Sequence, residues 1–221
     1  MSSCTRLGAC VTLLLSGALL LAVWLATKGA PVKAVGEEMI HPCFSEFCVH
    51  WLDTDGNRIE AHSASVLQHP SGDRWYWYGE SKKTSSLGDH GINCYSAASL
   101  AGPWKFEGEV LHQSEISVLG QPGPFVVERP SVLYNNQTGL FVMWFHLDTA
   151  GYKLRRVGVA ASANAGGPFE FVHSMQPDGV PSLDMSLSSD WDGMAYLARS
   201  CDNRLLESWA WGVWFQFLTV V

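Results

Sequence analysis

The sequence predicts an all-β fold of the β-propeller type, and three observations lead to this prediction. Short segments rich in aromatic residues are bounded by Gly, Pro, Asn or Asp, which is typical of strands separated by turns. A segment of similar sequence recurs about 65 residues further along the chain. No convincing amphipathic helix follows residue 30, so the core is expected to consist of sheets.

The recurrence is clearest around two Gly-Pro-aromatic segments. CYSAASLAGPWKFEG (94–108) and VAASANAGGPFEFVH (159–173) both contain small residues and a serine, then turn residues, then Gly-Pro, an aromatic residue and a phenylalanine. The two Gly-Pro pairs, at 102–103 and 167–168, are 65 residues apart. A recurring turn of this kind predicts that the same group of strands is built twice.

The aromatic strands ahead of these segments match as well. WYWYGE (75–80) and FVMWFH (141–146) place Trp77 and Trp144 67 residues apart, and a poorer third copy, DWDGMAYLARS, starts at Asp190. A unit of several strands that recurs at this interval resembles a propeller blade. A β-sandwich is the alternative, although it does not require the Gly-Pro-aromatic segment to recur.

Turn residues mark hairpins in the predicted sheets. DTDGNR from Asp53 and YNNQTG from Tyr134 combine Asn, Asp and Gly, which accept positive φ angles at low cost. About 190 residues follow the N-terminal apolar segment, enough for roughly three such units, whereas propellers close with four to eight blades. We therefore expect an incomplete propeller of about three blades over residues 49–203.

The last residues, 204–221, depart from this pattern. RLLESWAWGVWFQFLTVV loses the turn residues, contains three tryptophans and ends on Val-Val. We expect an atypical apolar tail, as if the chain were cut short. The alternative is a genuine C-terminal strand or a membrane-seeking segment, although Glu207 and Gln216 interrupt the apolar run.

An apolar segment from Leu7 to Thr27 precedes the predicted sheets. Its 21 residues lie between Arg6 and Lys28 without a charge and are long enough to cross a bilayer as a helix. Residues 1–30 are expected to be a signal-anchor or a cleaved signal peptide, followed by a linker over 31–48. Both alternatives predict the secretory pathway, with the remaining chain either membrane-anchored and lumenal or extracellular, or secreted.

An oxidising compartment affects how the cysteines are interpreted. Cys43, Cys48, Cys94 and Cys201 would meet conditions in which disulfides persist, and four cysteines allow three pairings. A metal site is the alternative, but the spacing is not that of a zinc knuckle. NQT at Asn136 is a glycosylation sequon, which this compartment would permit.

Composition and motifs exclude several classes of function. The net charge of −7 without a Lys/Arg cluster argues against nucleic acid as a partner. The sequence has no G-x-S-x-G elbow, no H-E-x-x-H and no phosphate-binding glycine loop. Its eight histidines are scattered, so we expect no metal and no cofactor. Sugars, other neutral small molecules and proteins remain as partners.

Ionisable residues recur at the edges of the aromatic strands. They are His62 in IEAHSAS, Glu80 in WYWYGE, Glu128 in VVERPSVLYN, Asp184 in VPSLDMSL, and His146 and Asp148 in MWFHLD. Successive blades would bring such side chains together, and one of several convergent carboxylates becomes easier to protonate. This arrangement suits glycoside hydrolysis, in which one carboxyl protonates the leaving oxygen and another activates water.

A simpler interpretation applies to each of these residues taken alone. A strand-edge glutamate is more often solvated or paired than catalytic, and Glu128 could pair with the neighbouring Arg129. A single histidine such as His62 is usually a hydrogen-bonded turn residue. Recurrence of acids in corresponding places is the observation that favours a site.

Six segments occur in the order seen in glycoside hydrolase family 43, and the chain most resembles its exo-β-1,3-galactanase-type branch. The segments are WLDTDGNRIEAHSASVL, WYWYGE, GINCYSAASLAGPWKFEGEVL, ERPSVLYNNQTGLFVMWFHLD, GVAASANAGGPFEFVHSMQPDG and SLDMSLSSDWDGMAYLARS. They cover about Val49 to Ser200. The resemblance implies a five-bladed β-propeller with an axial carbohydrate site, and hydrolysis with inversion of the anomeric centre.

The resemblance also implies roles for individual residues. Asp184 matches the acid that tunes the proton donor and orients the sugar. Glu80 and Glu128 match acids of the sugar-binding centre, and Glu128 lies near where a base would act, which makes it the second catalytic candidate. From their positions in or beside the aromatic strands, and not from a family motif, His62, Trp77 and His146 are the further substrate-binding candidates.

The sequence departs from the family pattern at three places. The family's AHGGG is AHSAS here, and its SRDM is SLDM, so that Leu183 replaces an arginine that would compensate Asp184. The family's general acid belongs to the fourth blade, which this chain lacks, and Glu207 does not match it.

These observations predict a glycosidase that hydrolyses a β-galactan-type or related polysaccharide. Loss of the general acid would typically slow the reaction by about 10²–10⁴. The alternatives are a membrane-anchored, non-catalytic carbohydrate-binding propeller and an interaction propeller without a sugar site.

Overall fold

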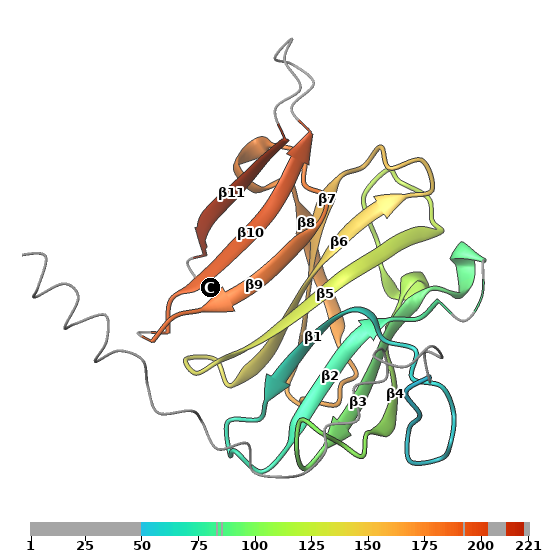
Figure 1. Cartoon of the computed structure of the whole chain (residues 1–221). Helices are drawn as coiled ribbons and strands as arrows, with labels where there is room; N and C mark the ends of the chain where they lie inside the picture. The colour runs from blue at the N-terminus through green and yellow to red at the C-terminus, as the bar shows by residue number, and fades with distance from the viewer. Residues whose placement is uncertain (1–49, 83, 85, 192, 203–210, 219–221) are drawn as a thin grey trace, which may run out of the picture. The chain divides into compact units, whose positions relative to one another are not determined.

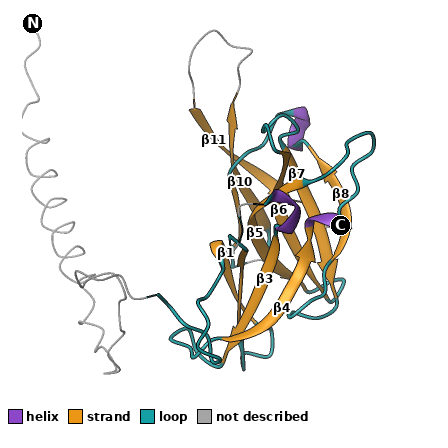
Figure 2. Ribbon diagram, turned by 90° about the vertical axis from the view of Figure 1, so that its right-hand side faces the viewer, coloured by secondary structure: helices purple, strands orange, loops and turns teal. Residues whose placement is uncertain are grey.

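The computed structural model describes residues 50–82, 84, 86–191, 193–202 and 211–218, which all lie in one compact unit, Pro42–Val221. Apart from three short 3-10 turns, these residues form strands and loops (Figure 2). The predicted all-β class is confirmed. The apolar segment 7–27 lies outside the described residues, and within them no helix is long and apolar enough to span a membrane.

Three antiparallel sheets contain the described strands, and each sheet is a meander of consecutive strands (Figure 1). The first consists of β1 (His62–Gln68), β2 (Trp75–Glu80), β3 (Gly91–Ala97) and β4 (Lys105–His112). The second consists of β5 (Phe125–Asn135), β6 (Leu140–Thr149), β7 (Arg156–Ser162) and β8 (Glu170–Met175). The third consists of β9 (Met185–Ser189), β10 (Ala195–Asp202) and β11 (Trp211–Leu218). The first strand of the second sheet, β5, lies beside both β1 and β9.

The 3-10 turns lie in the loops between the strands. They are η1 (Leu87–Asp89), η2 (Gln113–Glu115) and η3 (Pro177–Gly179). Meanders that follow one another in this way are consistent with propeller blades, and the number of blades stays a prediction.

The segment expected to be an atypical tail contributes a strand. Residues 211–218 pair antiparallel with β10 along its whole length, from Ala195 opposite Leu218 to Asp202 opposite Trp211. The structure thus agrees with the alternative of a genuine C-terminal strand. Aromatic and β-branched residues fit a pleated surface even where turn residues are missing.

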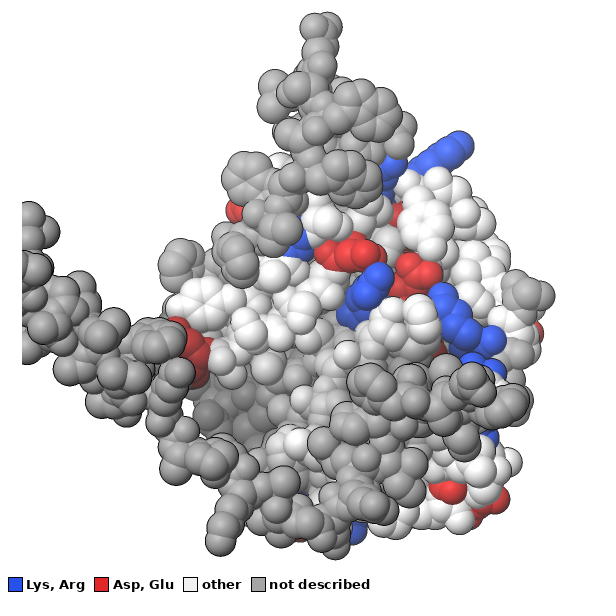
Figure 3. Space-filling view, in the orientation of Figure 1, with Lys and Arg blue, Asp and Glu red and all other residues white. Residues whose placement is uncertain are grey.

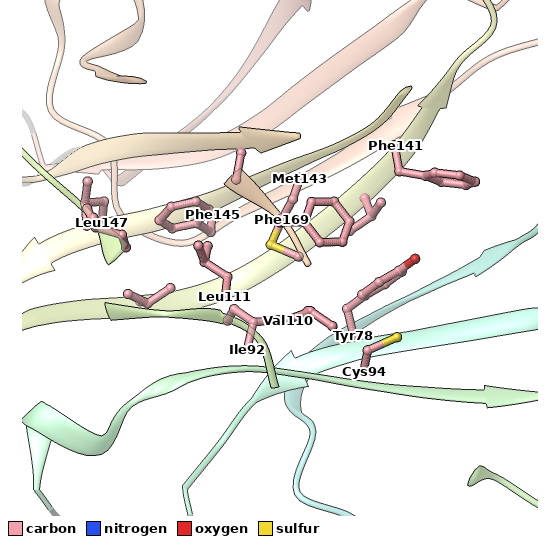
Figure 4. Close-up of a cluster of buried hydrophobic side chains, with 14 of the residues drawn as sticks. Tyr78, Ile92, Cys94, Val110, Leu111, Phe141, Met143, Phe145, Leu147 and Phe169 are labelled. Carbon is pink, nitrogen blue, oxygen red and sulfur yellow. The ribbon is translucent and has the colours of Figure 1, made fainter. Parts of the chain in front are cut away.

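A hydrophobic core joins the first and second sheets. Period-2 alternation places Phe141, Met143, Phe145 and Leu147 of β6 on one face. Figure 4 shows them together with Phe169, pointing toward side chains of the first sheet, namely Tyr78, Ile92, Cys94, Val110 and Leu111. The opposite face of the second sheet packs on the third through Trp144, Val157, Met185 and Leu197.

The cysteines in these cores carry no disulfide. Cys94 and Cys201 are both buried and free, so the expected oxidative pairing does not involve them in this structure. Burial raises the pKa of the Cys94 thiol far above its usual range. Both residues therefore pack as small apolar side chains. Cys43 and Cys48 lie outside the described residues.

The repeat predicted from the sequence is present, with a shift of one residue in the aromatic strands. Gly102-Pro103 and Gly167-Pro168 both occupy the turn before the last strand of a sheet, and both peptide bonds are cis. In the ladders, Ser65 pairs with Tyr78, and the equivalent Ser131 pairs with Trp144. Trp144 is therefore the counterpart of Tyr78, not of Trp77.

The two predicted turns differ in what they connect. Residues 136–139 join β5 to β6, where the Asn135 Oδ1 accepts hydrogen bonds from the backbone N–H groups of Gln137 and Thr138. Asn136 is exposed at this tip, and its glycosylation stays a prediction. The turn at Asp53 closes only a single bridge, between Leu52 and Arg58.

Gly79 allows a close approach of β2 to the chain just before β1. A Cβ atom at Gly79 would lie 2.3 Å from the carbonyl carbon of Ala61 and 2.4 Å from its Cα, and neither backbone atom can move as a side-chain end could. We expect Gly79→Ala to lower the free energy of unfolding by about 3 kcal/mol, as overpacking does. Urea denaturation measures this. Gly151→Ala is the control, because its Cβ would meet only the Lys153 side chain, at 3.5 Å or more. Equal stability of the two variants would contradict the close approach.

Candidate functional site

Strand ends from all three sheets contribute to one group of charged side chains. Glu80 ends β2, Glu128 lies in β5, and Asp184 directly precedes β9. Lys82 bridges Glu80 and Glu128, and Arg129 binds Asp184 through its side chain while its backbone N–H faces Glu80. Acidic and basic side chains lie side by side on the face in view in Figure 3. The structure thus brings the three acids singled out in the sequence into one network.

Glu80 is the most enclosed of these three acids. Its side chain is 3% exposed. Its Oε1 lies 3.3 Å from His62 Nδ1 and 3.5 Å from the Arg129 backbone nitrogen, and its Oε2 lies 2.6 Å from Lys82 Nζ. An ionised carboxylate at this depth requires such partners. Glu80 is therefore a paired acid, not a solvated strand end.

Glu128 accepts hydrogen bonds from two side chains and lies close to a third. Lys82 Nζ lies 3.3 Å from its Oε1, the Tyr152 hydroxyl donates to it at 3.1 Å, and His146 Nδ1 lies 3.5 Å from its Oε2. The His146 contact, together with Lys82 and Tyr152, lowers the pKa of Glu128 to about 2 in spite of its partial burial. A carboxylate so stabilised accepts hydrogen bonds well and takes up a proton poorly, so it is a weak general base.

His146 lies behind Glu128 and not at the surface of the site. Its side chain is 1% exposed, with Nε2 3.0 Å from the Asp148 carboxylate and Nδ1 facing Glu128. Burial disfavours the charged ring, but the two carboxylates outweigh this and raise the pKa of His146 above its usual value. His146 is thus enclosed between two acids behind Glu128, and its contact with substrate stays a prediction.

Asp148 anchors this buried histidine. It is fully buried and accepts hydrogen bonds from the backbone N–H groups of Thr149 and Leu154, at 2.9 and 2.8 Å. Burial disfavours its charge, but these hydrogen bonds and the one from His146 lower the pKa of Asp148. The order Asp148–His146–Glu128 therefore extends from the core to the site.

Arg129 pairs with Asp184 and not with the adjacent Glu128. Its Nε and Nη2 bind the two Asp184 oxygens at 3.1 and 3.0 Å, which is the bidentate geometry favoured by a guanidinium. Arg129 has a φ of 55° within a shift of register of β5, which turns its side chain toward the third sheet. Arg129 thereby supplies the positive charge that Leu183 does not.

Trp77 lies away from the acids. Residues three apart in a strand point to opposite faces, so Trp77 and Glu80 diverge. The Trp77 ring packs on Trp51 and Trp104, with centroid distances of 5.1 and 5.3 Å. Trp77 therefore lies outside the network of acids, and its contact with a sugar stays a prediction. His62, in contrast, is exposed and contacts Glu80.

The first and second sheets each contribute a histidine and a glutamate from two paired strands, but the two residue types occupy opposite strands in the two sheets. His62 of β1 pairs in register with Glu80 of β2, whereas Glu128 of β5 pairs in register with His146 of β6. In both sheets a register shift follows, with Ser63 or Arg129 at positive φ. The repeat thus places one histidine and one glutamate in each sheet.

A small cavity lies beside this network, between the first strands of the three sheets. Its volume is about 260 Å³, and it is lined by residues 63–65 of β1, 129–131 of β5 and 185–186 of β9. The serines of AHSAS therefore face the cavity. In the part of the chain that the structure describes, no cluster of His, Cys, Asp or Glu could hold a metal ion.

Two residues of the network were not predicted from the sequence. Lys82 follows Glu80 by two residues, and Tyr152 lies in the turn after β6. Neither belongs to a recurring motif, and each contacts an acid of another segment. The only feature of the sequence that could have indicated Lys82 is its position two residues after the strand-edge acid Glu80.

No protein-family model matches the chain. Among solved structures, an exo-β-1,3-galactanase from Phanerochaete chrysosporium, solved with β-1,3-galactotriose, is 36% identical with a TM-score of 0.63, over 70% of this chain and 36% of that one. A GH43 β-1,3-galactosidase with galactodeoxynojirimycin is 32% identical with a TM-score of 0.61, over 69% of this chain and 58% of that one. The chain is related to glycoside hydrolase family 43.

A curated relative points to the same group of enzymes. Arabinan endo-1,5-α-L-arabinosidase C from Emericella nidulans is 30% identical over 103 residues, which are 47% of this chain and 29% of the relative. The resemblance to family 43 seen in the sequence is thus confirmed by fold and by sequence. The chain spans between about a third and 58% of the length of these family 43 relatives' structures.

Proposed function

We propose that the chain is a glycosidase of the family 43 type that acts on a β-1,3-galactan-type oligosaccharide or polysaccharide. The observation that supports this best is the network of Glu80, Glu128 and Asp184 at adjoining strand ends, in a chain similar to enzymes of that specificity. We further propose that the three sheets are blades of a propeller and that the acids surround its axis.

Each acid then has a role that follows from its contacts. Glu128 is ionised and partly exposed, so it accepts hydrogen bonds from sugar hydroxyls and orients the ring. Glu80 fixes Lys82 and the backbone of Arg129 beside it. Asp184 is 62% exposed and held by Arg129, and the resemblance to family 43 makes it the candidate for the acid that tunes the proton donor.

Hydrolysis with inversion requires a carboxylic acid that protonates the leaving oxygen and a base that activates water on the other side of the ring. Glu128, with a pKa of about 2, is ionised at neutral pH and does not supply that proton. We therefore propose that Glu128 binds and orients the sugar, that Glu80 holds Lys82 and Arg129 in place beside it, and that none of the three acids is the proton donor.

Galactose release tests the proposed function. The full chain, expressed in a secretory host, is incubated with β-1,3-galactobiose, and the products are followed by proton NMR. We expect galactose to appear, with the α-anomer formed first, because an inverting enzyme converts a β-linkage to an α-product. No release by folded protein would contradict the glycosidase, and initial β-anomer would contradict inversion. Asp184→Asn should slow release by about 10²-fold or more.

A further inference from the structure

Lys82 is a cation placed between two acids that belong to different sheets. Its Nζ lies 2.6 Å from Glu80 Oε2 and 3.3 Å from Glu128 Oε1. Its side chain is 37% exposed, so the ammonium group is reachable from solvent. Partial burial disfavours the charge, but the two carboxylates outweigh this and raise the pKa of Lys82.

The groups around this bridge determine its charge. His62 and the Arg129 backbone N–H face Glu80, and His146 and Tyr152 face Glu128. Beyond them, Asp148 pairs with His146, and Asp184 pairs with the Arg129 side chain. The network thus contains four carboxyl groups, the basic side chains of Lys82 and Arg129, and the two histidines His62 and His146.

An ammonium group has three N–H donors; Lys82 donates to Glu128 and forms a close ion pair with Glu80. One donor is left for a hydroxyl oxygen, beside two acceptors that receive hydroxyl hydrogens. A neutral sugar with neighbouring hydroxyls matches this pattern of one donor and two acceptors. A carboxylate-bearing sugar would place a further acidic group beside Glu80 and Glu128.

We propose that Lys82 is a positioning and specificity-determining residue, which holds Glu80 and Glu128 together as acceptors and makes the site select neutral over acidic saccharides. This proposal rests on the proposed function, since it names the class of sugar that the same site takes. The proposal assigns a role to Lys82, which lies outside the sequence motifs, and it predicts that the site distinguishes saccharides by their charge.

Two measurements on the full chain test this proposal. In the first, glutamate carboxyl carbons labelled with ¹³C are titrated with acid, and Glu128 is assigned by its absence in Glu128→Gln. We expect Lys82→Met to raise the titration midpoint of Glu128 by one pH unit or more, and Lys82→Arg to restore it. Lys105→Met is the control, because Lys105 is an exposed lysine that pairs with Glu107 in the first sheet. An unchanged midpoint in folded Lys82→Met would overturn the proposal.

The second measurement compares two sugars on the unmodified chain, so its test of specificity does not depend on how a variant folds, and folded Lys82→Met is then titrated with galactose alone. Galactose and galacturonate are titrated separately and followed by amide chemical shifts. We expect galactose to bind at least tenfold more tightly, and Lys82→Met to lose tenfold in galactose affinity. Equal or tighter binding of galacturonate overturns the specificity.

The outcomes separate this inference from the proposed function. If galactose binds equally to the unmodified chain and to Lys82→Met, only the role of Lys82 is overturned. If neither sugar binds to folded protein, the proposed function is overturned, and the specificity is overturned with it.

Discussion

Glu128→Gln is expected to abolish measurable galactoside binding and to lower the free energy of unfolding at pH 7 by about 3 kcal/mol. Glutamine keeps the shape of the side chain but removes the charge that Lys82 and His146 face. The size follows from the difference between a pKa of about 2 in the folded chain and the ordinary value of 4.5. Calorimetric titration with β-1,3-galactobiose and urea denaturation measure the two effects.

The pH dependence of this variant gives a second test. A carboxyl with a lowered pKa stabilises the fold above its unfolded pKa, and this contribution is lost as the pH falls toward the folded value. As the pH falls from 4.5 to about 2, the free energy of unfolding of the unmodified chain should therefore decrease more than that of Glu128→Gln, which lacks the carboxylate. Glu60→Gln is the control, because Glu60 pairs with an exposed Arg58 and should change stability by less than about 1 kcal/mol. If the free energy of unfolding changed with pH in the same way for the unmodified chain and for Glu128→Gln, the contacts of Glu128 with Lys82, Tyr152 and His146 would be contradicted.

Asp148→Ala is expected to lower the free energy of unfolding by about 3–5 kcal/mol. The substitution leaves a buried imidazolium without its partner and two backbone N–H groups without their acceptor. Urea denaturation at pH 6 measures this, because His146 is charged there.

Asp148→Asn is the matched variant for this site. Its amide oxygen still accepts a hydrogen bond, so the loss should be smaller, about 1–2 kcal/mol. The pKa of His146, followed by NMR of the ring protons, should fall in both variants, because the first carboxylate that raises it is gone. Equal stability of Asp148→Ala and the unmodified chain would show that the buried histidine does not depend on Asp148.

The sequence alone predicted the all-β class, and it singled out three acids that the structure brings into one network. Alternation of apolar residues in 141–147 and the recurring Gly-Pro turns are local patterns, and both appear in the sheets. The acids were found because they recur at strand edges. Residues 211–218 were expected to be an atypical tail because turn residues are missing there. Their pairing with β10 is a contact between separate segments, which local sequence does not show.

The partners of the acids could not be predicted in the same way. A pair between Arg129 and Glu128 was the simpler interpretation, but the positive φ of Arg129 and the register shift direct its side chain to Asp184, 55 residues away. His146 and Trp77 were placed near substrate by their sequence neighbours, yet one is enclosed by carboxylates and the other faces the opposite side of its sheet. Such pairings depend on register and local twist, which residue identity does not specify.

Amide chemical-shift mapping with β-1,3-galactobiose shows where the chain binds sugar. If Glu80, Glu128 and Asp184 form one sugar site, the shifts that change should be those of residues 62–63, 80–82, 128–131, 152 and 184–186. Changes confined to the groove lined by 117–119 and 171–174, or no change in folded protein at millimolar sugar, would contradict that site.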